Sequence, residues 1–175
     1  SLNGILDQMM AENTNKILVA VDGSESSNNA LKQSFKLVQG GNQLIVLSVS
    51  PFYQTDHILT DVNNINDMLR AQTEHILSEA KDIAAECGVS INTRLEEGAI
   101  YQSIIEVADK ENCKMIVMGR LGMTRIEKAL LGDETDKVIG HYNGITLVIP
   151  KNTSLGFDSI LIATDGSKYS DNALD

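Results

Sequence analysis

The sequence has no tryptophan and only two cysteines among its 175 residues. Cys87 and Cys113 do not form a metal-ligand cluster, and we expect two reduced thiols, as in a cytoplasmic protein. No apolar run approaches the roughly 20 residues that are needed to cross a bilayer. Residues 1–10 lack a basic segment and a long apolar segment, so no secretory signal is predicted. The length suits one ordinary α/β domain and little more.

Positive charge is scarce as well. The chain has 14 Lys and Arg residues against 24 Asp and Glu residues, which gives a formal net charge of −10. Nucleic-acid surfaces depend on basic patches, so this balance argues against a nucleic-acid partner. It leaves open a local phosphate site made of backbone N–H groups, because such a site needs no basic surface.

Catalytic motifs are also missing. His57, His75 and His141 show no pairing with a nucleophile by spacing. The sequence contains neither a G-x4-GK[ST] phosphate loop nor a G-x-G-x-x-G dinucleotide motif. With no acid, base or nucleophile in view, we do not predict an enzyme.

Apolar runs of strand length alternate with amphipathic helical patterns along most of the chain. The alternation predicts an α/β fold with right-handed crossovers, a parallel sheet and helices on both faces. The region from Pro51 to about Asn66 is expected to be irregular. The expected strands are 17–21, 44–49, 89–95, 114–118 and 145–149, and the expected helices begin near residues 26, 68, 100 and 134.

Candidate site residues fall at the ends of the predicted strands. Asp22, Val49 and Gly119 each end a strand, and ligands of open α/β sheets bind beyond the carboxyl ends of the strands. Gly119, Gly122 and Gly132 precede the helix that begins near 134. Glycines let backbone N–H groups approach a phosphate, and the helix start adds unpaired donors, so this loop is a candidate anion cradle.

An internal repeat links the two ends of the chain. Residues 17–24, Ile-Leu-Val-Ala-Val-Asp-Gly-Ser, recur at 160–167 as Ile-Leu-Ile-Ala-Thr-Asp-Gly-Ser. The polar residues match in register, which favours a tandem protein with a second repeat that begins near the C-terminus. The expected divisions are an N-terminal extension at 1–15, a domain at 16–151, a linker at 152–157 and the start of a second repeat at 158–175.

Residues 16–151 resemble the universal stress protein family. The resemblance rests on the segments 19–24, 44–49 and 116–119 and on the glycine spacing G-x2-G-x9-G. It implies the five-stranded parallel sheet of adenine nucleotide alpha-hydrolase-like proteins, with strand order 3-2-1-4-5. It also implies a stress-response module that binds ATP or a related adenine nucleotide. Whether Mg²⁺ accompanies the nucleotide is left open, and no metal ligand is assigned.

The resemblance implies roles for individual residues beside their structural ones. The Asp22 carboxylate would lie near the ribose hydroxyls, although an Asx-turn or a helix N-cap role would also explain it. Backbone groups of Val49 would read the adenine edge, although Val49 also suits the core. The expected nucleotide-binding set is Asp22, Val49, Met118, Gly119, Arg120, Gly122, Gly132, Asp133 and Thr135.

Asp133 departs from the family pattern, which has a hydroxyl at this position. Asp is a strong N-cap residue, so a structural role is also expected. Its charge lies where a phosphate is expected, and this puts triphosphate binding in doubt unless Mg²⁺ bridges the two groups.

Two alternatives stay open: a structural dimerisation module with a vestigial glycine loop, and a weak ATPase of the same superfamily. Strand 145–149 is predicted to be an edge strand through which the chain forms a homodimer, with pairing to a tandem domain as the alternative. Residues 160–163 are too few to bury an apolar face alone, so they are predicted to pair with a sheet.

Overall fold

The computed structural model describes residues 15–38, 41–53, 60–119, 134–152, 154–155 and 161–163. The strands are β1 (Lys16–Ala20), β2 (Gln43–Ser50), β3 (Ile91–Glu97), β4 (Met115–Gly119), β5 (Ile145–Ile149) and β6 (Leu161–Ala163). The helices are α2 (Glu25–Ser34), α3 (Thr60–Glu86), α4 (Ile100–Lys110) and α6 (Glu134–His141), and a 3-10 turn covers Phe35–Val38.

One sheet organises the molecule, with strand order β3-β2-β1-β4-β5-β6. The first five strands in this order are parallel, which confirms the predicted fold and strand order. β6 is antiparallel to β5, with Leu161 opposite Val148 and Ala163 opposite Thr146. The predicted pairing of the 160–163 segment is therefore confirmed for Leu161–Ala163. The prediction that 145–149 forms the edge of the sheet is wrong, because β6 of the same chain covers that edge.

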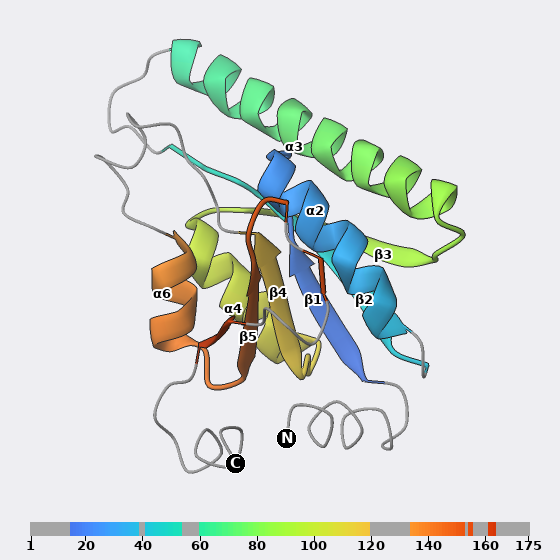
Figure 1. Ribbon diagram of the computed structural model, residues 1–175. Helices are drawn as coiled ribbons and strands as arrows, with labels where there is room; N and C mark the ends of the chain where they lie inside the picture. The colour runs from blue at the N-terminus through green and yellow to red at the C-terminus, as the bar shows by residue number, and fades with distance from the viewer. Residues whose placement is uncertain are drawn as a thin grey trace.

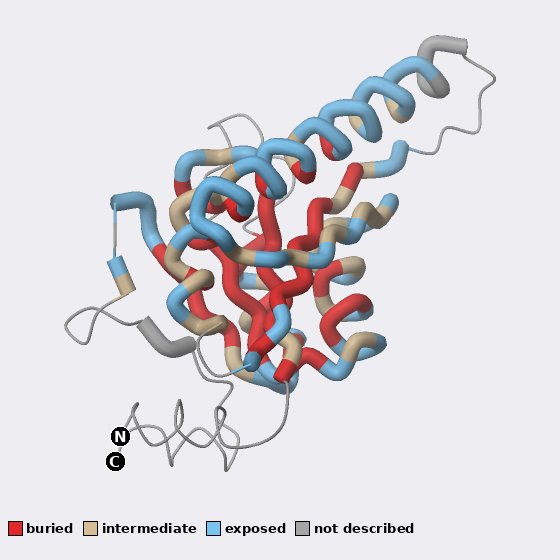
Figure 2. The backbone as a smooth tube through the Cα atoms, turned by 90° about the vertical axis from the view of Figure 1, so that its right-hand side faces the viewer, coloured by how far each residue is buried: buried red, intermediate tan, exposed pale blue. Residues whose placement is uncertain are grey.

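Helices cover both faces of the sheet, α2 and α3 on one side and α4 and α6 on the other (Figure 1). Alternate strand residues point to opposite faces, so β1 supplies Leu18 to one core and Val19 to the other. Both residues are fully buried. Figure 2 shows the buried backbone gathered in the central strands, as expected for a parallel sheet covered on both faces.

Helix α3 differs most from the prediction. It begins at Thr60, inside the region expected to be irregular, and its side chains at Ile65 and Met68 are exposed. Because this end of α3 buries little, no apolar periodicity marks it in the sequence. Its predicted end is confirmed, since Gly88 adopts a positive φ just after the helix. None of the helices in the described ranges is long and apolar enough to cross a bilayer.

Candidate functional site

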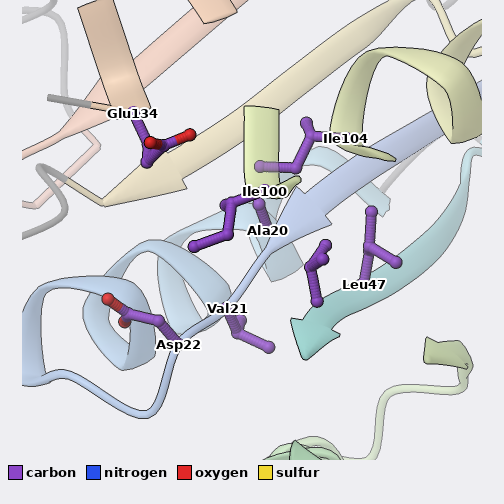
Figure 3. A pocket seen from close by; sticks show the side chains of 8 residues that line it. Ala20, Val21, Asp22, Leu47, Ile100, Ile104 and Glu134 are labelled. Carbon is purple, nitrogen blue, oxygen red and sulfur yellow. The ribbon is translucent and has the colours of Figure 1, made fainter. Parts of the chain in front are cut away.

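A pocket opens at the carboxyl edge of the sheet, between the ends of β1 and β2 and the first turns of α4 and α6 (Figure 3). Its volume is about 80 Å³. A single buried water needs roughly 10–15 Å³ on this measure, so the pocket admits part of an organic ligand. The lining residues are Ala20, Val21, Asp22, Leu47, Val49, Ile100, Ile104 and Glu134.

Asp22 lies in the turn that joins β1 to α2. Gly23 has a φ of +79°, and the Ser24 N–H donates to Asp22 Oδ1 over 3.0 Å. Ser24 in turn caps α2, because its Oγ accepts the N–H of Ser27 over 3.1 Å. The Asx-turn that the sequence allowed for Asp22 is therefore present. The same residue lines the pocket, so its structural role does not remove it from the site.

Glu134 is the other carboxylate of the pocket, and it is only 5% exposed. Its Oε2 accepts the backbone N–H of Tyr101 over 3.0 Å, and its Oε1 accepts from Lys137 Nζ over 2.9 Å. Tyr101 lies in the first turn of α4, whose N-cap residue, Ala99, provides no side-chain cap. Glu134 therefore satisfies one of the unpaired donors at the start of α4 from a different helix.

Apolar side chains form the rest of the pocket wall. Val49 lines it from the end of β2 and packs on the core beneath α4, together with Ile100. Met118 is fully buried in the same core and does not line the pocket. Of the strand-end residues predicted from the sequence, the structure brings Asp22 and Val49 into one cavity.

Gly119 ends β4 beneath the first turn of α2. A Cβ atom at this position would lie 2.5 Å from the backbone carbon of Ser26 and 2.6 Å from Ser26 Oγ. The close approach of α2 therefore requires a glycine here, whatever the loop beyond it binds. Thr135 is buried on α6. Arg120, Gly122, Gly132 and Asp133 lie outside the described residues, so the anion cradle remains a prediction.

The sequence did not point to Glu134, nor to the apolar wall residues other than Val49, as parts of the site. An acidic residue at the start of a helix is usually explained by the helix dipole, so Glu134 did not stand out. Ile100 fitted the apolar stripe of α4 and carried no signal of a ligand. Within the described residues, no group of three or more His, Cys, Asp and Glu side chains could hold a metal ion.

The five parallel strands in the order β3-β2-β1-β4-β5 are shared with a solved structure that is 26% identical, with a TM-score of 0.61 over 82% of this chain and 100% of that one. The fold is therefore that of the adenine nucleotide alpha-hydrolase-like class. Residues 13–150 match the model of the universal stress protein family, and the chain belongs to this family. It is 31% identical over 140 residues to a universal stress protein of Methanocaldococcus jannaschii. The alignment covers 78% of this chain and 82% of that relative.

Solved structures of relatives share the fold. A universal stress protein solved in complex with cAMP is 25% identical, with a TM-score of 0.62 over 81% of this chain and 100% of that one. A family member from Arabidopsis thaliana, solved with AMP bound, is 14% identical, with a TM-score of 0.54 over 79% of this chain and 93% of that one. The second likeness concerns the fold alone.

Proposed function

We propose that this protein is a cytoplasmic regulatory module of the stress response that binds an adenine nucleotide at the carboxyl edge of its sheet. The observation that carries the proposal is the meeting of Asp22 and Val49 in one pocket. These residues end two different strands, and the family resemblance implies a nucleotide-binding role for each of them. The complex of a relative with cAMP supports the same class of ligand.

The chemistry of the pocket suits the nucleoside part of such a ligand. Leu47, Val49 and Ile104 offer apolar surface to a flat base, while the Asp22 carboxylate accepts hydrogen bonds from hydroxyl groups. Neither Lys nor Arg is among the residues that line the pocket. Phosphate groups would therefore lie outside it, where the glycine loop predicted from the sequence would offer backbone N–H groups to an anion.

Calorimetric titration with adenosine, AMP, cAMP and ATP, with and without Mg²⁺, tests the proposal. We expect binding of at least one of these ligands, and we expect Asp22→Ala to weaken it about tenfold or more, because a charged hydrogen-bond acceptor is lost. Asp82→Ala is the matched control, since Asp82 is an exposed acid on α3. Absence of binding by the wild type, or equal weakening by the two substitutions, would overturn the proposal.

A further inference from the structure

The pocket has two carboxylates, and the proposed function uses only one of them. Glu134 comes from α6 and Asp22 from the turn after β1. In Figure 3 both carboxylates lie on the same side of the view, while Leu47 and Ile104 lie on the other. A ligand in this pocket therefore meets an apolar end and an end that offers hydrogen-bond acceptors.

Glu134 keeps the capacity to bind a ligand although it already has partners. A carboxylate offers about four acceptor positions on its two oxygens. The Tyr101 N–H and the Lys137 ammonium use one position on each oxygen. These two contacts also hold the side chain in place, so its remaining acceptor positions are preorganised beside the pocket.

We propose that Glu134 is a ribose-recognition residue that acts with Asp22, each carboxylate accepting one of the two vicinal hydroxyls of a bound ribonucleoside. The inference rests on the proposed function and deepens it, because it names the part of the ligand that the acidic end selects. The ligand class is a nucleoside or nucleotide with an intact 2′,3′-diol, such as adenosine, AMP or ATP. We therefore expect cAMP, whose 3′-oxygen is esterified, to bind this chain more weakly than AMP.

The ribose fits this end of the pocket better than the other parts of a nucleotide. A phosphate beside two carboxylates would be repelled, because Lys137 pairs with Glu134 and offsets only one of the two charges. The base has apolar surface at the opposite end, at Leu47 and Ile104. Hydroxyl groups are neutral and donate hydrogen bonds, so they match carboxylate acceptors on both counts.

The diagnostic variants are Glu134→Gln and Asp22→Asn, titrated with adenosine, 2′-deoxyadenosine, 3′-deoxyadenosine and inosine. Gln keeps the shape of Glu134 and an oxygen for the Tyr101 N–H while it removes the charge. We expect the wild type to prefer adenosine over both deoxy analogues by about tenfold or more, as for a hydrogen bond to a charged group. Glu134→Gln should reduce the difference in affinity between adenosine and one of the two deoxy analogues. Asp22→Asn should reduce the difference in affinity between adenosine and the other analogue.

Three results would overturn the inference while leaving the proposed function intact. The first is wild-type protein that binds either deoxy analogue as tightly as adenosine, a result that needs no variant to fold. The second is a Glu134→Gln variant that loses affinity equally for all four ligands, which would mean that Glu134 only caps α4. The third is a Glu134→Gln variant in which the difference in affinity between adenosine and inosine changes, while the difference between adenosine and the deoxy analogues stays the same. That result would mean that Glu134 contacts the base. A wild type that binds none of the four ligands, AMP, cAMP or ATP would instead contradict the proposed function.

Discussion

The two edges of the sheet use acidic side chains in different ways. Near the amino edge, Glu111 accepts from Lys16 over 2.7 Å and also pairs with Arg94, so two cations neutralise its charge. At the carboxyl edge, Asp22 and Glu134 border a cavity. Glu134 also pairs with a cation, Lys137, so pairing alone does not separate the two edges. The comparison teaches that an acidic residue is informative about function when it borders a cavity, and mainly about stability when it borders none.

The amino edge is closed by polar contacts between neighbouring segments. The Tyr142 hydroxyl donates to the backbone oxygen of Cys113 over 2.9 Å, so the segment before β5 is tied to the segment before β4. Lys114 N–H donates to the oxygen of Lys16 over 3.0 Å and ties β4 to β1 in the same way. The pocket described above lies at the opposite, carboxyl edge, in agreement with the general rule for open α/β sheets.

The largest expected effect belongs to Gly119→Val, which inserts a branched side chain between β4 and α2. The added Cβ would lie 2.5 Å from the Ser26 backbone, and a backbone contact cannot be relieved by rotating a side chain. We expect the free energy of unfolding to fall by about 3 kcal/mol, at the upper end of overpacking costs. Urea denaturation followed by circular dichroism measures it.

Gly140→Ala is the matched control for Gly119→Val. Gly140 lies within α6, and a Cβ there would meet nothing within 4 Å. Alanine favours helix over glycine, so this variant should be more stable by about 0.5–1 kcal/mol. Equal stability of the two variants would show that the close packing of α2 on β4 does not require the glycine.

The sequence predicted the sheet well because its signals are local and strong. Apolar runs such as 44–49 mark buried strands, and the crossover rule orders the chain between them. The site was predicted in part: Asp22 and Val49 end strands, whereas Glu134 depends on the packing of α6 against α4, which no local pattern encodes. The repeat at 160–167 also could not show that Leu161–Ala163 would pair with β5 of its own chain, since strand pairing is not local.

A smaller effect is expected at the amino edge for Tyr142→Phe. The change removes the donor to Cys113 and leaves a buried carbonyl unpaired, so we expect a loss of about 1–2 kcal/mol in the free energy of unfolding. Burial raises the pKa of Tyr142 to about 12, so the phenol remains a donor at neutral pH. Its contribution should be lost only as the pH rises from the ordinary value of 10.0 through the raised pKa.

Tyr53→Phe, at an exposed tyrosine, is the control for Tyr142→Phe and should leave stability unchanged. Ligand affinity should also stay within about twofold in Tyr142→Phe, because the residue lies at the edge opposite the pocket. If Tyr142→Phe instead lost much of its ligand affinity and little of its stability, the ligand site would lie at the amino edge and not at the carboxyl edge.

The smallest effect is expected for Glu111→Gln, which tests whether the paired acid of the amino edge is purely structural. Hydrogen bonds from Lys16, and then from Arg94, hold the pKa of Glu111 below its ordinary value of 4.5. A lowered pKa means that the stabilisation is present above pH 4.5 and is lost as the pH falls through the lowered value. Glu111→Gln should therefore lower the thermal midpoint slightly at pH 7, and the gap to the wild type should shrink as the solution is acidified.

Salt separates this ionic contribution of Glu111 from packing. High salt should narrow the gap at pH 7, because it screens charges that solvent reaches. Glu86→Gln, an exposed acid on α3, controls for the loss of net charge alone. If the difference in thermal midpoint between the wild type and Glu111→Gln stayed the same down to pH 3 and in high salt, Glu111 would stabilise the fold through packing and not through its charge. Weaker nucleoside binding in Glu111→Gln would mean that the two edges are coupled, since an acid enclosed by two cations near the far edge has no direct way to contact the ligand.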